Sequence, residues 1–232
     1  MGREKGFTLI EILVSLAIAS VVSTAIYATY TTQHRIYMTQ KQIADIQQNL
    51  RTCIYLLEEE IKHACYDPTG TAGPSIRSAG SEIFRFQCDL NENGHAFSDT
   101  ATVSSDDSLA GSGTDPHEDI SYSLSTKRTL RRATWGMNAD MADHIEALDF
   151  VYFNQAGERL APLPLTTENM AAVRAVEVTL IARSERPDPG HRDTKIYRNL
   201  RGDTLISGSG DHYHRRSLSK VVYLRNIPGA RP

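Results

Sequence analysis

The stretch FTLIEILVSLAIASVVSTAIYATY, residues 7–30, is an almost unbroken apolar run that contains a single carboxylate, Glu11. A helix that rises about 1.5 Å per residue would carry this run across a bilayer core of about 30 Å. A charge in hydrocarbon costs several kcal/mol, so such residues usually have a partner and a function. The sequence therefore predicts a membrane-spanning helix whose acid needs a partner.

The residues before this run indicate how it would be oriented. Arg3 and Lys5 give the first six residues a positive charge, and no small-x-small cleavage site follows the run. A secretory signal has an apolar core of about 7 to 15 residues that ends in such a site, so we expect the longer run here to stay attached. Positive charge favours the cytoplasmic side. Residues 1–6 are expected inside, and the chain after about residue 30 outside the cytoplasm.

The junction KGFTLIE, residues 5–11, resembles the leader of the type IV pilin-like prepilin family. The resemblance implies that a prepilin peptidase cuts between Gly6 and Phe7 and methylates the new amine of Phe7. It also implies that Glu11 neutralises the N-terminal amine of a neighbouring subunit during assembly. An ammonium and a carboxylate attract far more strongly in low dielectric than in water, and leaving either one unpaired there is costly.

Composition limits what the rest of the chain can be. Of 232 residues, about 200 remain after the apolar run, within the usual range for one domain. The 28 acidic and 25 basic residues give a net charge of −3, which argues against a domain that binds nucleic acid as a whole. With 40% apolar residues, an ordinary globular domain is expected.

A second helical pattern follows the apolar run. Apolar residues recur at spacings of three, four and seven, with polar residues on the other faces. These residues are Ile43, Ile46, Leu50, Leu57, Ile61 and Ala64, with Ile54 beside the stripe. The helix should end near Tyr66-Asp67-Pro68, because the residue before a proline avoids the α region. One helix is therefore predicted from about Phe7 to about Ala64.

Strands are predicted where apolar residues alternate and β-branched or aromatic residues gather. The expected strands are residues 82–88, 119–124, 129–133, 145–153, 173–183 and 219–227. Turn-rich stretches separate them at residues 70–80, 91–116 and 186–210. The last stretch joins two good strands, so we interpret it as an extended hairpin excursion.

The body of the chain narrows the resemblance. IEALDF at 145–150, NQAG at 154–157 and RAVEVTL at 174–180 look like PilW-type minor pilins and GspJ-type minor pseudopilins, and RRSLSKVVYLRN at 215–226 resembles the PilW side more. The resemblance implies an α+β, pilin-like fold: a long N-terminal helix, transmembrane and then amphipathic, packed on an antiparallel β-sheet domain with long loops. The predicted division is a leader at 1–6, an assembly half of the helix at 7–30, an amphipathic half at 31–66, and a β-rich domain at 67–232.

One loop carries a pattern of possible calcium ligands. Asp89, Asn91 and Asn93 place oxygen atoms at alternate positions before Gly94, which is how a calcium loop opens. The twelfth position is Thr100 instead of the bidentate Glu that closes such loops. Replacement ligands would have to come from Asp99, Asp106, Asp107, Glu118 or Asp119. The alternative interpretation is a turn built on Asn93-Gly94.

Three cysteines would face an oxidising compartment, where a disulfide can form. Cys53 and Cys65 would lie about 18 Å apart on one helix, which is too far for a bridge. Cys65 with Cys88 is therefore the disulfide candidate. The alternative is that all three are free thiols that pack as small apolar residues.

The remaining polar clusters give little sign of catalysis. His212 and His214 lie beside Asp211 and near Ser209, but no Gly-x-Ser-x-Gly elbow accompanies them, so we interpret them as part of a polar loop. Arginines gather at two places, and we interpret them as solvated strand ends. They are Arg128, Arg131 and Arg132, and Arg215 and Arg216.

The sequence thus predicts a minor pilin-like structural subunit that is not an enzyme and that primes, caps or enters a type IV pilus. Its expected partners are prepilin peptidase, other pilins or pseudopilins through the N-terminal helix, and the bacterial inner membrane before assembly, with the C-terminal domain periplasmic. No cofactor is expected other than the calcium ion discussed above, and nothing indicates a nucleic acid partner. Two alternatives stay open: a GspJ-like minor pseudopilin of type II secretion, and a membrane-anchored extracytoplasmic binding protein or enzyme.

Overall fold

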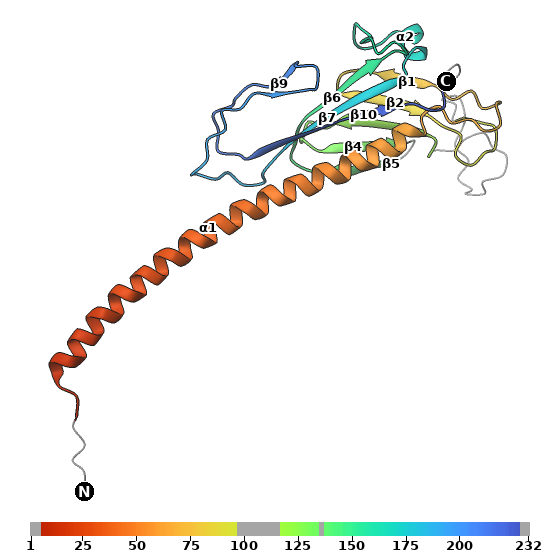
Figure 1. Cartoon of the computed structure of the whole chain (residues 1–232). Coiled ribbons are helices and arrows are strands. Elements are labelled where there is room, and N and C mark those ends of the chain that lie inside the picture. Colours follow the sequence, from red (N-terminus) through yellow and green to blue (C-terminus); the bar gives the residue numbers. More distant parts are fainter. Residues whose placement is uncertain (1–5, 97–116, 135–136, 228–232) are drawn as a thin grey trace. The chain divides into compact units, whose positions relative to one another are not determined.

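The computed structural model describes residues 6–96, 117–134 and 137–227. The chain forms two compact units, one up to Ala44 and one from Asp45 onward. In the first unit, helix α1, which spans Leu9–Lys62 (Figure 1), begins two residues after Phe7. Residues 6–38 are all exposed. This part of the helix therefore offers an uncovered apolar surface.

The second unit is built around the last turns of α1. One stripe of the helix is buried, at Ile46, Leu50, Cys53, Ile54, Leu57 and Ile61. This stripe confirms the predicted apolar periodicity, and Ala64, just after the helix, is also buried. The remaining faces are mostly polar, although Tyr55 and Leu56 are also exposed there. An amphipathic helix of this kind is stable because its apolar stripe packs on something else.

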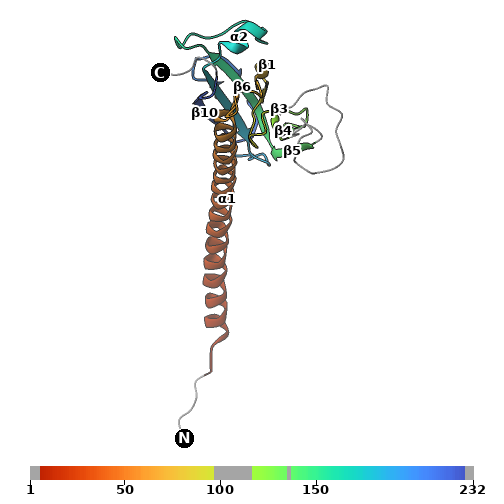
Figure 2. The same ribbon diagram turned by 90° about the vertical axis from the view of Figure 1, so that its right-hand side faces the viewer.

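A five-stranded antiparallel sheet is one of the two sheets on which the buried stripe of α1 packs. Its strand order follows the chain: β1, β2, β3, β4, β5. The strands are β1 (Ile76–Ala79), β2 (Ile83–Gln87), β3 (Asp119–Leu124), β4 (Leu130–Thr134) and β5 (Met137–Ala142). Figure 2 shows these strands beside the C-terminal end of α1.

A three-stranded antiparallel sheet forms the other part, in the order β10, β7, β6. Its strands are β6 (Ile145–Phe153), β7 (Ala175–Arg183) and β10 (Arg215–Tyr223), and a short helix, α2 (Thr167–Ala171), lies between β6 and β7 in the chain. The segment between β7 and β10 holds a two-stranded hairpin of β8 (Tyr197–Arg198) and β9 (Thr204–Ile206). Because β7 and β10 pair directly, this segment is the extended hairpin excursion that the sequence predicts.

One apolar core joins α1 to both sheets. Phe84 of β2 lies against Phe150 and Tyr152 of β6, with ring centroids 5.7 and 5.6 Å apart. The Tyr152 hydroxyl donates to the carbonyl of Gly80 at 2.9 Å, so the buried polar end of the ring is satisfied. Aromatic residues from both sheets thus pack together in the core that also contains the buried stripe of the helix.

The structure corrects parts of the predicted strand set. Strands at 119–124 and 145–153 match, but the strand predicted at 219–227 is β10 and starts four residues earlier, at Arg215. The shift occurs because Arg215 is paired with buried carboxylates and can enter the sheet, as described below. Strand β1 lies within a stretch read as turns, and β5 was missed because its residues are largely exposed and do not alternate.

Candidate functional site

The N-terminus of α1 is closed by its own side chains. The backbone amide and the hydroxyl of Thr8 both donate to Oε2 of Glu11, at 2.9 and 2.8 Å, and the Glu11 amide lies 3.4 Å from the Thr8 hydroxyl oxygen. This is a capping box, in which the residue before the helix and the third helical residue satisfy each other's polar groups. The pattern Thr-x-x-Glu is the sequence signal of this cap, a role that the expected intersubunit contact of Glu11 does not include.

The predicted cleavage junction lies just outside this cap. Gly6, Phe7 and Thr8 precede the first helical residue and are exposed, and the Phe7 side chain is 87% exposed. A Cβ atom built on Gly6 would meet nothing within 4 Å. The chain itself therefore does not require glycine at this position.

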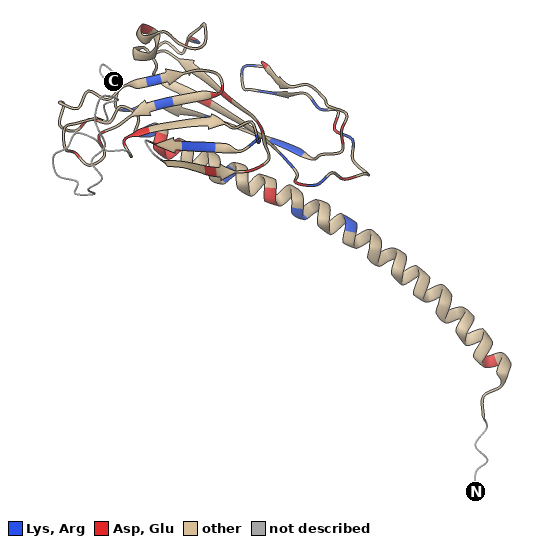
Figure 3. Cartoon of the chain, turned by 180° about the vertical axis from the view of Figure 1, so that it is seen from behind, with Lys and Arg blue, Asp and Glu red and all other residues tan. Residues whose placement is uncertain are grey.

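The part of α1 that belongs to the first unit, up to Ala44, has the properties of a membrane anchor. Among the described residues, α1 is the helix that is long and apolar enough to cross a membrane, with a mean hydropathy of 2.3 in its best window. Between Glu11 and Arg35 the sequence has no Asp, Glu, Lys or Arg, and Figure 3 shows this long tan stretch after one acidic residue. In length and composition, this segment therefore suits a membrane anchor.

Hydroxyl side chains on this part of the helix are satisfied internally. Ser20 donates to the carbonyl of Ala17 at 2.7 Å, and Thr24 donates to the carbonyl of Ser20 at 2.8 Å. Thr29, Thr31 and Thr32 make similar bonds one turn back. Since polar groups in hydrocarbon must find partners within the protein, these bonds make the hydroxyls compatible with lipid.

The loop predicted to bind calcium is held by hydrogen bonds from its own backbone. Asp89 is fully buried, and its two oxygens accept from the amides of Asn93 at 3.2 Å and Gly94 at 3.1 Å. Gly94 has a φ of +78°, a conformation that glycine adopts without strain. Within the described residues, no group of three or more His, Cys, Asp or Glu is placed to hold a metal ion.

The predicted replacement ligands are engaged elsewhere or lie outside the described residues. Oε1 of Glu118 accepts from the amides of Leu90 and Asn91, and Asp119 pairs with Arg85 at 2.7 Å. Thr100, Asp99, Asp106 and Asp107 lie outside the described residues. Calcium binding by Asp89, Asn91 and Asn93 stays a prediction.

The three cysteines are free and buried in the structure. The amide of Cys65 donates to the carbonyl of Gln87, next to Cys88, at 2.8 Å, but the predicted disulfide between Cys65 and Cys88 is not formed. Burial raises the pKa of Cys53 and Cys65 to about 11 and that of Cys88 to about 12. The thiols are therefore protonated and pack as small apolar groups, which is the alternative that the sequence left open.

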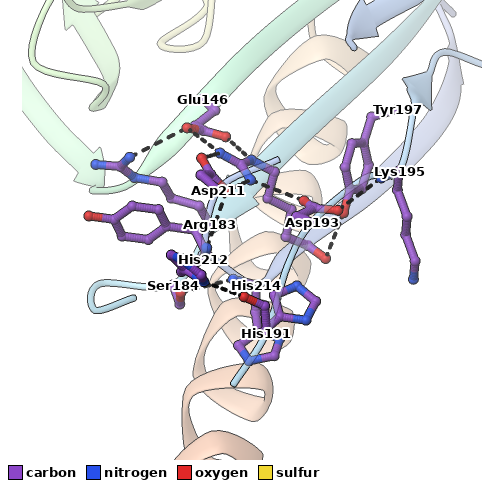
Figure 4. A network of polar contacts seen from close by, with 12 residues as sticks. Glu146, Arg183, Ser184, His191, Asp193, Lys195, Tyr197, Asp211, His212 and His214 are labelled. Carbon is purple, nitrogen blue, oxygen red and sulfur yellow. Dashed lines mark hydrogen bonds and ion pairs between the residues drawn. The ribbon is translucent and has the colours of Figure 1, made fainter. Parts of the chain in front are cut away.

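The most densely charged place in the described chain surrounds Arg215 (Figure 4). The Arg215 side chain is 3% exposed and is paired with Glu146, with Asp193 at 3.0 Å and with Asp211 at 2.6 Å. The bonds from Arg215 hold the pKa of Asp211 well below its usual range. The interpretation of Arg215 as a solvated strand end was therefore wrong. A buried cation is tolerated here because three carboxylates compensate for its lost hydration.

This network fastens the excursion between β7 and β10 to the sheet. Asp193 and Asp211 belong to the two ends of the excursion, whereas Glu146 belongs to β6. His214 contacts Asp188 at 3.1 Å and stacks on His191 with ring centroids 3.9 Å apart. The histidines and Asp211 thus have separate partners, so the structure does not bring them together as a Ser/His/Asp site.

A second charged cluster locks α1 to the five-stranded sheet. Glu60 accepts a hydrogen bond from the Tyr122 hydroxyl on β3 and pairs with Arg132 on β4 at 2.9 Å. Burial raises the pKa of Tyr122, so its hydroxyl stays protonated and donates. At the other sheet, Asn226 donates to the carbonyl of Lys62 at 2.9 Å. These contacts fix the end of the helix within the second unit.

Two families match the chain. Residues 1–27 match the family described as Prokaryotic N-terminal methylation motif, and residues 114–226 match Type IV Pilus-assembly protein W. A type IV-like pilin from Thermus thermophilus has a similar structure, with 15% identity and a TM-score of 0.49 over 78% of this chain and 97% of that chain. No curated protein matches.

Proposed function

We propose that this chain, whose residues 1–27 match the N-terminal methylation motif and whose residues 114–226 match the PilW family, is a PilW-type minor type IV pilin-like subunit. Its mature form would begin at Phe7 and enter a type IV pilus through Glu11. Prepilin peptidase would cut between Gly6 and Phe7 and methylate the new amine. The helix would wait in the inner membrane and then leave it for the filament, where neighbouring helices replace lipid. The match to the pilus-assembly family favours this filament over a type II secretion pseudopilus.

The observation that carries the proposal is the way in which Glu11 uses its carboxylate. Oε2 accepts both bonds from Thr8, whereas Oε1 accepts no hydrogen bond from the described residues. Thr8 supplies neutral donors and leaves the negative charge without a cation. A charge without a counter-ion is costly in an apolar surrounding, and the ammonium group of a neighbour's Phe7 would neutralise it.

The junction supports processing by an outside enzyme. Gly6 has open space around its α-carbon, so the fold gives no reason for glycine there. The exposed segment before the capping box is accessible to a peptidase. Glycine at position 6 would then be required by the active site of the peptidase and not by the fold of this chain.

The part of α1 in the first unit suits both proposed states of the helix, the one in the membrane and the one in the filament. Arg3 and Lys5 would keep the leader in the cytoplasm, and the second unit would then lie in the periplasm. In the filament, helices pack closely where residues are small. The small residues on this surface are Ala17, Ala19, Ser20, Ser23 and Ala25, and all of them are exposed.

The replacement Glu11→Gln tests the role of the charge. Glutamine at the third helical position still serves in a capping box, so this variant keeps the cap and removes the charge. We expect it to be inserted into the membrane and cleaved, but to appear in sheared filaments at a level lower by about tenfold or more. Asp45→Asn, on the same helix beyond the apolar run, is the matched control and should enter filaments normally. Incorporation of Glu11→Gln at the level of the unaltered chain would contradict the proposal.

A further inference from the structure

Strand β10 is an edge of the three-stranded sheet, because the strand order is β10, β7, β6. An edge strand presents backbone N–H and C=O groups with which another chain can pair. The nine residues of β10, Arg215–Tyr223, pair with β7 in a register without a bulge. The edge is therefore regular enough to accept a further strand.

The alternation of hydrogen bonds shows which residues face outward. The amide of Leu224 donates to the carbonyl of Arg174 at 2.9 Å, so the even-numbered residues of β10 bond to β7. Consistent with this pattern, the carbonyl of Arg215 accepts from the Tyr197 hydroxyl, outside the sheet. The outward-facing residues are Ser217, Ser219, Val221 and Tyr223, and no backbone bond outside the β7 ladder reaches them from the described residues.

A cleft of about 560 Å³ lies at the C-terminal end of this edge. Phe153, Ala175 and Val221 line it, and they belong to a small apolar cluster that is separate from the main core. Tyr223, one of the outward-facing residues, also lines the cleft and is 71% exposed. The cleft and the backbone edge thus form one continuous surface.

The charge of the cleft is opposite to that of the whole chain. Arg174 and Arg201 line it, and no Asp or Glu does, although the chain has a net charge of −3. The Arg201 guanidinium lies 4.4 Å from the centre of the Phe153 ring and 3.8 Å from Glu177. The cleft therefore combines an apolar floor with a cationic rim, which suits an apolar side chain next to a carboxylate.

We propose that β10 and this cleft bind an extended, acid-bearing segment of another pilus subunit. The segment adds as a strand along the outward-facing residues, places an apolar side chain on Phe153 and Val221, and sets a carboxylate beside Arg174 and Arg201. In strand addition, main-chain hydrogen bonds provide affinity and pockets for side chains provide specificity. The identity of the partner as a pilus subunit rests on the proposed function.

The same surface does not suit a helix or a lipid. An α-helix uses its backbone groups internally except at its ends, so it cannot pair with the edge of β10. An acidic headgroup could meet the arginines, but it has no backbone to pair with Ser217 and Ser219. The occupant that uses both parts of the surface is an extended peptide.

Photo-crosslinking in filament-forming cells tests this proposal on the full chain. Benzoylphenylalanine in place of Tyr223 reports contacts at the cleft, and the same group in place of Met137, which is 60% exposed on β5, is the control. We expect about tenfold more adduct from position 223 than from position 137. Mass spectrometry of the adduct should map an extended segment of a pilus subunit with Asp or Glu beside the crosslink.

Three replacements in the excursion test the charge. Arg201→Ala should lower the adduct about tenfold, Arg201→Lys should restore most of it, and Arg198→Ala, in the same hairpin but outside the cleft, should leave it unchanged. No excess at position 223, or an adduct with lipid or with a pilin N-terminal helix, would overturn the inference. The N-terminus is sequenced in the same samples: a chain processed at Phe7 without an adduct refutes the docking surface alone, and an unprocessed chain refutes the proposed function.

Discussion

The amide and the hydroxyl of Thr8 both donate to one oxygen of Glu11, so the acid inside the apolar run caps its own helix. The cap satisfies polar groups that lipid could not hydrate, and it leaves the second carboxylate oxygen available to a neighbour. Glu11 thus has a structural role within the subunit and a proposed role between subunits.

Replacing Thr8 by Val should loosen the helix start and leave the charge of Glu11 in place. Losing a side-chain cap costs about 1 kcal/mol, which corresponds to about fivefold faster local opening. Hydrogen exchange of the Glu11 and Ile12 amides in detergent micelles would measure it. Thr31→Val, which removes a hydroxyl bonded within the helix, should leave these two amides unchanged. Equal exchange in Thr8→Val and the unaltered chain would argue against the cap.

Replacing Arg215 by Met should destabilise the second unit severely. The change leaves Glu146, Asp193 and Asp211 together without their shared cation, and breaking a buried ion pair from one side costs about 3–5 kcal/mol. Urea unfolding of the purified full chain would measure the free energy. The control is Arg216→Met, because the Arg216 side chain donates to the Arg215 carbonyl and lies at the edge of the network; it should cost less than about 1 kcal/mol. Similar losses in both variants would refute the network as the main anchor of the excursion.

The same network predicts how stability depends on pH. Hydrogen bonds from Arg215 hold the pKa of Asp211 below its usual 3.8. A carboxyl group with a depressed folded-state pKa stabilises the fold at pH values above its unfolded pKa, and that contribution is lost as the pH falls through the folded value. The free energy of unfolding should therefore decrease as the pH is lowered below about 4, and the decrease should be smaller in Arg215→Met. An equal decrease in both proteins would show that Asp211 does not depend on Arg215.

The calcium hypothesis has a direct test. Because both Asp89 oxygens already accept backbone amides, we expect the melting temperature of the full chain to be the same with calcium and with chelator. A rise of several degrees with calcium, lost in Asp89→Asn, would show that the loop rearranges to bind the ion.

The leader motif and the buried stripe of α1 could be predicted from the sequence because their signals are local. The leader junction at Gly6 and Phe7 is contiguous in the chain, and the buried stripe at Leu50 and Leu57 follows the helical period. The capping box is equally local, but the charge of Glu11 drew the interpretation toward intersubunit contacts and away from Thr8.

The Arg215 network could not be predicted in this way. Its carboxylates come from positions 146, 193 and 211, so no local pattern marks Arg215 as buried. The misplaced strand has the same origin, because the apolar residues Val221 and Val222 suggested a later strand, whereas β10 begins at Arg215. The burial of Arg215 and the start of β10 both depend on ion pairs between residues that are far apart in the sequence.

Intact-mass and peptide mass spectrometry of the protein from membranes decides whether the chain is processed as a prepilin. We expect a mature chain that begins at Phe7 and carries a methyl group on its amine. A chain that still begins at Met1 or Gly2, with an unmethylated Phe7, would contradict it.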